Sequence, residues 1–204
     1  MGNDHSGVSA VILAAGRSAR MGQAKQLLRV GGRMVLERTL ENVRRSGVEE
    51  VVLVLGFSAE IIQQKLPTAL LEDLKVVVNR GYEQGMAGSL REGLAAVSPM
   101  MDAALIVLAD QPFVRPETID RVIDKYRQTK AKIVIPFYMG QRGNPVLLDR
   151  SVFSEVMALE GDTGSRAIFG NHADGIVEVD VNDEGIVLDI DDRADYERLC
   201  GLEE

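Results

Sequence analysis

The chain has 204 residues, of which 46% are hydrophobic, and this length is typical of one domain with a sizeable buried core. We therefore expect a single domain over residues 1–204, with residues 1–7 as a short, polar and disordered tail. The net charge of −8 argues against nucleic-acid binding, which needs an extended basic surface. The sequence has neither a run of about 18 apolar residues nor a signal-peptide pattern, so we expect a cytoplasmic protein with no membrane partner.

Short apolar runs alternate with amphipathic segments along the first two thirds of the chain. The apolar runs predict strands at residues 8–13, 51–55, 74–78, 104–109 and 132–136. The segments between them have helical spacing at residues 35–46, 58–66, 89–97 and 116–129. This alternation predicts an α/β domain with a mainly parallel sheet and right-handed crossovers.

The elements become shorter after residue 135. We expect a loop at 140–144, a strand at 145–148, helices at 151–158 and 165–169, and a hairpin at 177–189. Ligands of open α/β sheets bind outside the carboxyl ends of the strands. The loops that follow Leu13, Leu55, Val78 and Ala109 are therefore expected to converge on one cleft.

The first loop has the composition of a phosphate-binding loop. Residues 13–25 read Leu-Ala-Ala-Gly-Arg-Ser-Ala-Arg-Met-Gly-Gln-Ala-Lys. Its small residues let backbone N–H groups approach a phosphate, and Arg17, Arg20 and Lys25 add charged donors. Five residues separate Gly16 from Gly22, so the loop is not a P-loop, and the chain has no Gly-x-Gly-x-x-Gly fingerprint of a dinucleotide-binding oxidoreductase. The pattern favours a nucleoside triphosphate ligand.

Residues 13–25 match the Leu-Ala-Ala-Gly-x-x-x-Arg-Met-Gly-x-x-Lys loop of a known family residue for residue. The chain resembles the nucleotidyltransferases related to the molybdenum cofactor cytidylyl- and guanylyltransferases. The resemblance implies a single nucleotidyltransferase domain over residues 1–204, with a three-layer α/β/α, Rossmann-like nucleotidyltransferase fold, a mainly parallel sheet and a small late β-hairpin. It also implies that Arg20 and Lys25 hold the triphosphate, and that the nucleotide contacts the loop residues Leu13, Ala14, Ala15 and Gly16.

Asp110 lies at the carboxyl end of the fourth predicted strand, in the sequence Leu-Ala-Asp-Gln-Pro. Mg²⁺ usually takes one or two protein carboxylates and completes its shell with water and phosphate oxygens. An aspartate before a proline-containing bend can also serve only to turn the chain. The Ala-Asp-Gln-Pro motif is similar to the metal-binding motif of the family, and this favours Asp110 as a catalytic metal ligand.

A glycine-rich turn at residues 81–88 precedes a predicted helix, and helix N-termini favour anionic or polar ligands. The alternative is a tight turn in which Ser89 is an ordinary N-cap. The resemblance implies that Asn79, Gly85 and Ser89 line the pocket for the base and ribose. It leaves the identity of the base open.

Two further loops are candidates for binding the acceptor. Residues 140–146 place Arg142 between two glycines, and residues 161–166 read Gly-Asp-Thr-Gly-Ser-Arg. Arg142 could be a solvated loop arginine, as most arginines are. The first segment resembles the Gly-x-Arg-Gly-x-Pro-Val sequence of cytidylyltransferase-like members. The resemblance implies an acceptor site made by Arg142, Gly143, Asn144, Asp162 and Arg166.

Residues 188–193 read Leu-Asp-Ile-Asp-Asp-Arg, and we expect them to end a strand, which would place Asp189 and Asp191 on one face. Aspartate-rich turns are also common as solvated connections. The family has an Asp-Ile-Asp-Thr-Pro-like segment here, whereas this chain has Asp192-Arg193 in place of Thr-Pro. We expect Asp191 to be the second metal ligand.

Together these motifs imply a Mg²⁺-dependent nucleotidyltransferase. It would transfer CMP from CTP to the terminal phosphate of molybdopterin and release pyrophosphate, with an apo-molybdenum hydroxylase as a candidate partner. CTP is favoured because the first loop reads Leu-Ala-Ala-Gly, whereas guanylyltransferases tend to read Leu-Ala-Gly-Gly. A guanylyl or sugar-1-phosphate nucleotidyltransferase is the enzymatic alternative. A maturation module that binds nucleotide or cofactor without catalysis is the alternative of another class.

Overall fold

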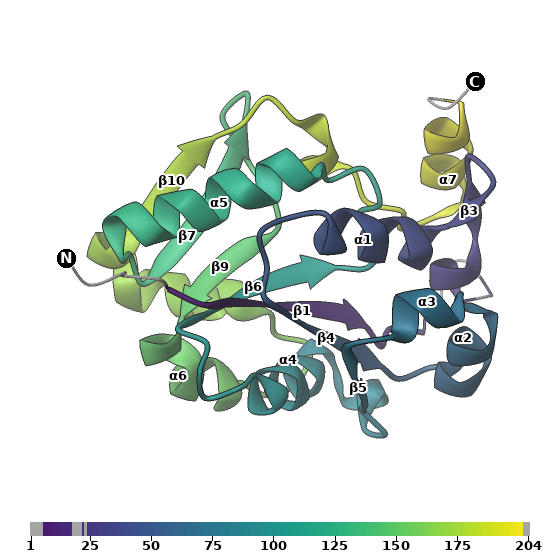
Figure 1. Ribbon diagram of the computed structural model, residues 1–204, viewed down its shortest axis with the longest axis horizontal. Helices are drawn as coiled ribbons and strands as arrows, with labels where there is room; N and C mark the ends of the chain where they lie inside the picture. The colour runs from purple at the N-terminus through teal and green to yellow at the C-terminus, as the bar shows by residue number, and fades with distance from the viewer. Residues whose placement is uncertain (1–5, 18–21, 23, 202–204) are drawn as a thin grey trace.

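The protein is built on one large sheet that contains all but two of the strands formed by the described residues (Figure 1). The structure, a computed structural model, describes residues 6–17, 22 and 24–201. Arg20 lies outside the described residues. The strands run in the order β10 (Ile176–Asp180), β7 (Ile133–Tyr138), β9 (Val146–Asp149), β6 (Ala103–Leu108), β1 (Val8–Ala14), β4 (Glu50–Leu55) and β5 (Leu74–Val78).

The sheet is mainly parallel, as predicted. β1 lies at its centre and pairs in parallel with both β4 and β6, and β5 continues the parallel set beyond β4. β9 is antiparallel to β6 and β7, and β10 is parallel to β7. In β1 every residue except Leu13 is buried, because helices cover both faces of the central strands.

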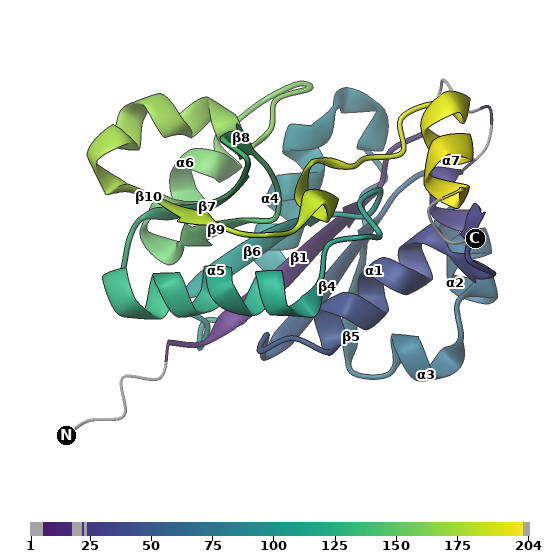
Figure 2. The ribbon, with the colours of Figure 1, turned by 90° about the horizontal axis from the view of Figure 1, so that it is seen from above.

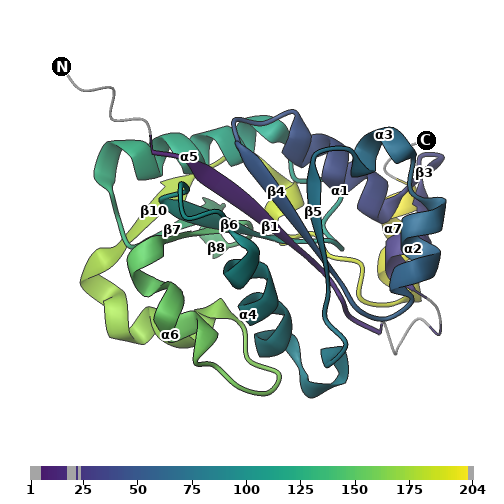
Figure 3. The ribbon, with the colours of Figure 1, turned by 60° about the horizontal axis from the view of Figure 1, so that its bottom comes forward.

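Helices cover the sheet in two outer layers, which confirms the predicted three-layer α/β/α architecture (Figures 2 and 3). Apolar side chains of α1 (Val35–Arg44), α2 (Ala59–Lys65) and α5 (Pro116–Thr129) share one core cluster with the sheet. Those of α4 (Met86–Ala96) and α6 (Phe153–Met157) share the cluster on the opposite face. A four-residue helix, α3 (Thr68–Leu71), lies next to α1 at the edge of the sheet.

The C-terminal helix α7 (Arg193–Cys200) packs against a small two-stranded sheet of β2 (Arg29–Val30) and β3 (Arg33–Met34) (Figure 1). Leu199 is fully buried there with Val30, and the hydroxyl of Tyr196 donates to the carbonyl oxygen of Arg29 at 2.7 Å. These contacts tie the end of the chain to the segment that follows the first loop.

The predicted hairpin at residues 177–189 is wrong. β10 pairs in parallel with β7, and residues Glu184–Val187 form a 3-10 turn. The buried carboxylate of Asp183 accepts from the hydroxyl of Thr118 at 2.6 Å and from the amide of Arg115 at 2.9 Å, both at the start of α5. These bonds hold the chain over α5, so it does not return along β10. A short late hairpin occurs instead between β7 and β8 (Gln141–Arg142).

Ser6 and Gly7, which we expected in a polar tail, are buried at the edge of the domain. The amide of Gly7 donates to Asp102 at 3.1 Å, and Arg127 donates to the carbonyl oxygen of Ser6 at 3.3 Å. Across the part of the chain that is described, no helix is long and apolar enough to cross a bilayer.

Candidate active site

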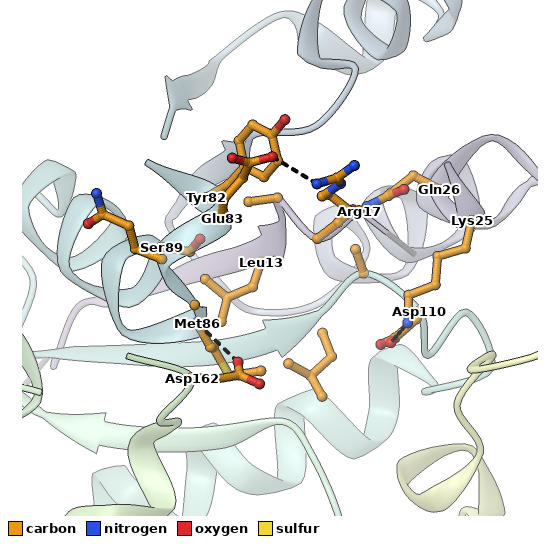
Figure 4. Close-up of a pocket in the computed structure, with 16 residues that line it drawn as sticks. Leu13, Arg17, Lys25, Gln26, Tyr82, Glu83, Met86, Ser89, Asp110 and Asp162 are labelled. Carbon is orange, nitrogen blue, oxygen red and sulfur yellow. Dashed lines mark hydrogen bonds and ion pairs between the residues drawn. The ribbon is translucent and has the colours of Figure 1, made fainter. Parts of the chain in front are cut away.

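A cavity of about 560 Å³ opens at the carboxyl ends of β1 and β6 (Figure 4). It is lined by residues from the segments after β1, β5 and β6, together with Asp162 from a later loop. The segment after β4, which we also expected to line the cavity, lies behind Ala15 and Tyr82. A side chain at Gly56 would meet the carbonyl oxygen of Ala15 and the Cβ of Tyr82, each at 2.7 Å. We refer to this space as the first cavity.

The end of β1 and the loop after it line the first cavity with Leu13, Ala15 and Gly16. Ala14 is buried behind them and contributes its carbonyl oxygen, which accepts from Nε2 of Gln26 at 2.9 Å. The same Nε2 lies 3.3 Å from the carbonyl oxygen of Gly16. The side chain of Gln26 therefore bridges the backbone carbonyl groups of Ala14 and Gly16 and supports the start of the loop. Gln26 was not predicted from the sequence, because its partners are backbone carbonyl oxygens, which no sequence motif records.

Lys25 and Asp110 point toward one another in the first cavity and form an ion pair between Nζ and Oδ2 (Figure 4). Each side chain is only 16% exposed. Lys25 Nζ also lies 3.3 Å from Oδ1 of Asp191. Burial by itself would lower the pKa of Lys25, but the charges and hydrogen bonds of Asp110 and Asp191 raise it above its usual value. Lys25 is therefore a cation shared by two carboxylates.

The second oxygen of Asp110, Oδ1, is buried and has no hydrogen-bond partner among the described residues. A buried carboxylate oxygen without a partner is energetically costly unless a donor or a cation reaches it. Described residues form no group of three or more acidic, His or Cys side chains arranged to hold a metal. Because a hard cation such as Mg²⁺ needs only one or two carboxylates beside its waters and phosphates, Asp110 fits such an ion.

The C-terminal segment reaches Asp110 through its backbone, although it is not a strand. The amide of Ile190, a fully buried residue, donates to the carbonyl oxygen of Asp110 at 3.1 Å. Asp189 and Asp191 therefore flank the end of β6. Burial, followed by the charges of Asp191 and Asp110, raises the pKa of Asp189 above its usual value. Both aspartates considered from the sequence thus lie beside Asp110.

The turn before α4 differs in detail from the expectation. Ser89 and Gly85 line the first cavity, but Asn79 does not: its amide donates to the hydroxyl of Ser89 at 3.1 Å and accepts from the amide of Gly81 at 2.9 Å. Ser89 is not an N-cap, because α4 begins at Met86. Gly85 has φ +108°, and a Cβ there would lie 2.3 Å from the carbonyl carbon of Gly161.

A second cavity of about 460 Å³ adjoins the first, with which it shares the side chains of Leu13, Met86 and Leu108. Of the predicted acceptor residues, four line this second cavity: Arg142, Gly143, Asn144 and Arg166. Asp162 lines the first cavity instead, where Oδ1 accepts from the amide of Met86 at 3.3 Å (Figure 4).

Arg142 is positioned by an aromatic ring and by a close backbone contact. Its guanidinium carbon lies 5.3 Å from the centre of the Phe169 ring. A Cβ on Gly143 would lie 2.5 Å from the carbonyl oxygen of Ile186, so the loop needs glycine at this point. Burial, and then the charge of Arg166, lower the pKa of Arg142 below its usual value. The pair creates a positive region suited to an anion.

Among the polar residues that line the cavities but were not predicted from the sequence are Gln26, Glu83 and Gln111. Glu83 forms an exposed ion pair with Arg17 at 2.9 Å at the first cavity (Figure 4). Gln111 follows Asp110 within the Ala-Asp-Gln-Pro motif, so the motif itself is a sequence signal for this residue. No comparable local signal identifies Glu83.

Comparison with known proteins extends over most of the chain. Residues 10–176 match the model of the MobA-like NTP transferase domain. The chain is 31% identical over 200 residues to nicotine blue oxidoreductase from Paenarthrobacter nicotinovorans, covering 94% of this chain and 96% of that protein. It is 26% identical over 195 residues to molybdenum cofactor cytidylyltransferase from Escherichia coli K12, covering 94% of each.

Solved structures agree with these sequence matches. The crystal structure of Rv0371c from Mycobacterium tuberculosis H37Rv superimposes with a TM-score of 0.86 and 34% identity, covering 96% of this chain and 98% of the other. A complex of that protein with manganese gives a TM-score of 0.82 and 32% identity, covering 96% and 99%. The resemblance inferred from the first loop is confirmed, and the chain belongs to the MobA-like NTP transferase family of nucleotidyltransferases.

Proposed function

We propose that this protein transfers CMP from CTP to the terminal phosphate of a molybdopterin-type cofactor and releases pyrophosphate. The observation that carries the proposal is the pair of adjoining cavities, one holding Lys25 and Asp110 and the other holding Arg142 and Arg166. Two cavities that meet at shared walls can present a nucleotide and a second anionic substrate to one another. The cofactor product would pass to an apo-molybdenum hydroxylase in the cytoplasm.

The reaction needs no nucleophile from the protein. An oxygen of the acceptor phosphate attacks the α-phosphorus of CTP, a new P–O bond forms, and the bond to the β-phosphate breaks. A phosphate monoester has a second pKa of about 6, so at neutral pH it is largely ionised without a general base. Catalysis then depends on positioning and on the neutralisation of charge. Arg20 and Lys25 would bind the triphosphate and stabilise the departing pyrophosphate, and Arg142 would orient the acceptor.

Asp110 and Asp191 would hold Mg²⁺. The partnerless Oδ1 of Asp110 and the proximity of Asp191 to Lys25 support this assignment, as does the manganese complex of Rv0371c. A bound divalent cation supplies Lewis-acid stabilisation of the transferring phosphate. In this structure the ammonium group of Lys25 contacts both carboxylates. Lys25 would therefore turn from them toward the triphosphate when the nucleotide binds.

CTP is proposed as the nucleotide on two grounds. The first loop has Ala15 where guanylyltransferases tend to have glycine, and the similarity to the cytidylyltransferase of Escherichia coli covers 94% of both chains. Ala15, the position at which the two kinds of loop differ, is one of the residues that line the first cavity.

The test is pyrophosphate release from purified protein with Mg²⁺, molybdopterin and each of CTP, GTP, ATP and UTP. We expect release with CTP, and loss of this release in Asp110→Asn, which preserves the size of the side chain. Asp124→Asn, an exposed substitution on α5, is the matched control and should remain active. Release with GTP alone would indicate a guanylyltransferase, and release only with a sugar 1-phosphate would indicate the corresponding transferase. Nucleotide binding without turnover of any acceptor would indicate a binding module.

Oxidoreductase activity is a second candidate, because the similarity to nicotine blue oxidoreductase covers 96% of that protein. The absence of a Gly-x-Gly-x-x-Gly sequence in this chain argues against a Rossmann-type dinucleotide site. Oxidation of NADH or NADPH in the presence of nicotine blue, followed at 340 nm, would support this candidate. We expect no oxidation above the rate without protein.

A further inference from the structure

Gln111 occupies a distinctive place between the two cavities. It follows Asp110 directly in the chain, but Asp110 lines the first cavity and Gln111 lines the second. Gln111 is only 5% exposed. A buried amide normally satisfies both its donor and its acceptor, so each atom of this side chain needs a partner.

The orientation of the Gln111 amide is determined by its neighbour. Nε2 donates to the carbonyl oxygen of Ile186 at 3.3 Å, and that oxygen also accepts from the amide of Asn144 at 3.0 Å. Because a carbonyl oxygen cannot donate, the NH₂ side of Gln111 must face Ile186. The opposite atom, Oε1, is buried and finds no hydrogen-bond donor within the described part of the protein. Gln111 thus holds a fixed acceptor atom that lacks a partner.

The same cavity holds two cations. Arg142 and Arg166 line it together with Gln111, and Arg142 is held beside the ring of Phe169. An anion alone would satisfy the arginines but would leave Oε1 of Gln111 without a donor. A ligand that combines an anionic group with an N–H or O–H donor would satisfy both.

We propose that Gln111 is a specificity residue for the acceptor, and that its Oε1 accepts a hydrogen bond from an N–H or O–H group on the organic part of a phosphate monoester bound by Arg142 and Arg166. The inference rests on the proposed function, in which the second cavity receives the acceptor. Discrimination arises because a ligand without the donor leaves a buried acceptor atom unpaired. Gln111 therefore selects among phosphate esters by the chemistry of their organic part.

The test compares two bicyclic phosphate monoesters by isothermal titration calorimetry. The phosphate ester of 6-hydroxymethylpterin carries ring N–H donors, and 2-naphthyl phosphate has a ring system of similar size without donors. We expect the wild-type protein to bind the pterin ester roughly ten- to a hundredfold more tightly. Equal affinity of the wild-type protein for the two esters would overturn the proposal, whatever any variant does.

Gln111→Met removes the amide while keeping the length of the side chain. We expect this variant to lose affinity for the pterin ester by the same roughly ten- to hundredfold factor and to bind 2-naphthyl phosphate as the wild type does. Gln128→Met, at an exposed position on α5, is the matched control and should change neither affinity. An equal loss for both esters in Gln111→Met would indicate a merely structural role and would contradict the proposal.

The binding measurement needs neither CTP nor turnover, so it separates this inference from the proposed function. Selective binding that depends on Gln111 would support the inference even in a protein that releases no pyrophosphate. In a protein that does turn over, Gln111→Met should raise the KM for the acceptor and leave the KM for CTP unchanged. An unchanged KM for the acceptor would overturn the inference while the proposed function stood.

Discussion

Lys25 and Asp110 lie 85 positions apart in the chain and form an ion pair in the first cavity, where Lys25 also approaches Asp191. The ammonium group thus lies between the two carboxylates that are proposed to hold a metal ion. A cation already bound to both carboxylates competes with a second cation for them.

Replacement of Lys25 by methionine should therefore increase the affinity of the nucleotide-free protein for Mn²⁺. The two carboxylates would lose their internal counter-ion, and we expect a gain on the order of tenfold. Titration followed by electron paramagnetic resonance measures the free Mn²⁺ directly. Lys65→Met, at an exposed position near the end of α2, is the matched control and should not change the affinity. Unchanged or weaker binding by Lys25→Met would contradict the prediction.

Gln26→Met should destabilise the protein and weaken CTP binding. The substitution removes the donor that bonds the carbonyl oxygens of Ala14 and Gly16, and a buried group without its partner costs about 1–3 kcal/mol. Urea unfolding measures the free energy, and the KM for CTP reports the altered loop. The exposed Gln64→Met on α2 serves as the control. A variant as stable as the wild type would show that Gln26 does not support the loop.

Gly85→Ala should destabilise the protein by roughly 1–3 kcal/mol or more, because the residue has φ +108° and its new Cβ would collide with Gly161. Gly170→Ala is a suitable comparison, since a Cβ there meets no atom within 4 Å. Thermal unfolding of the two variants should show a lower Tm for the first and little change for the second. Similar Tm values would mean that the loop at residues 161–162 moves away without cost.

Asp149 should make part of the stability dependent on pH. Burial alone would raise its pKa, but hydrogen bonds from the hydroxyls of Ser151 and Tyr126, both at 2.6 Å, outweigh burial and hold the pKa below its usual value. A pKa lowered by folding stabilises the native state above the unfolded pKa of about 4, and this stabilisation is lost as the pH falls through the folded value.

The difference in unfolding free energy between the wild type and Asp149→Asn should therefore be largest near pH 7 and should shrink below about pH 4. Urea unfolding across this range tests the expectation, with the exposed Asp124→Asn as the control. A difference in unfolding free energy that stays constant with pH would contradict the stabilising role of the ionised Asp149 carboxylate.

Local patterns predicted the elements whose boundaries depend on local interactions. The helix expected at residues 116–129 is α5, with the same bounds, because Pro116 suits its first turn and its amphipathic spacing is regular. The helix expected at residue 89 begins at Met86, where the turn at Gly85 packs against Gly161. The late hairpin was wrong because the partners of Asp183 lie more than 60 positions away, at the start of α5.

The α/β class and the family could be predicted from the sequence, because each of these is recorded in short segments with regular spacing. Which side chains share a cavity depends on the three-dimensional packing of the chain. Parallel strands bring the loop after β1 beside the end of β6, and the hydrogen bond from Ile190 to Asp110 brings Asp191 to Lys25 from 166 positions away. Such contacts depend on the packing of distant segments, and no local pattern encodes the direction in which a buried carboxylate or amide points.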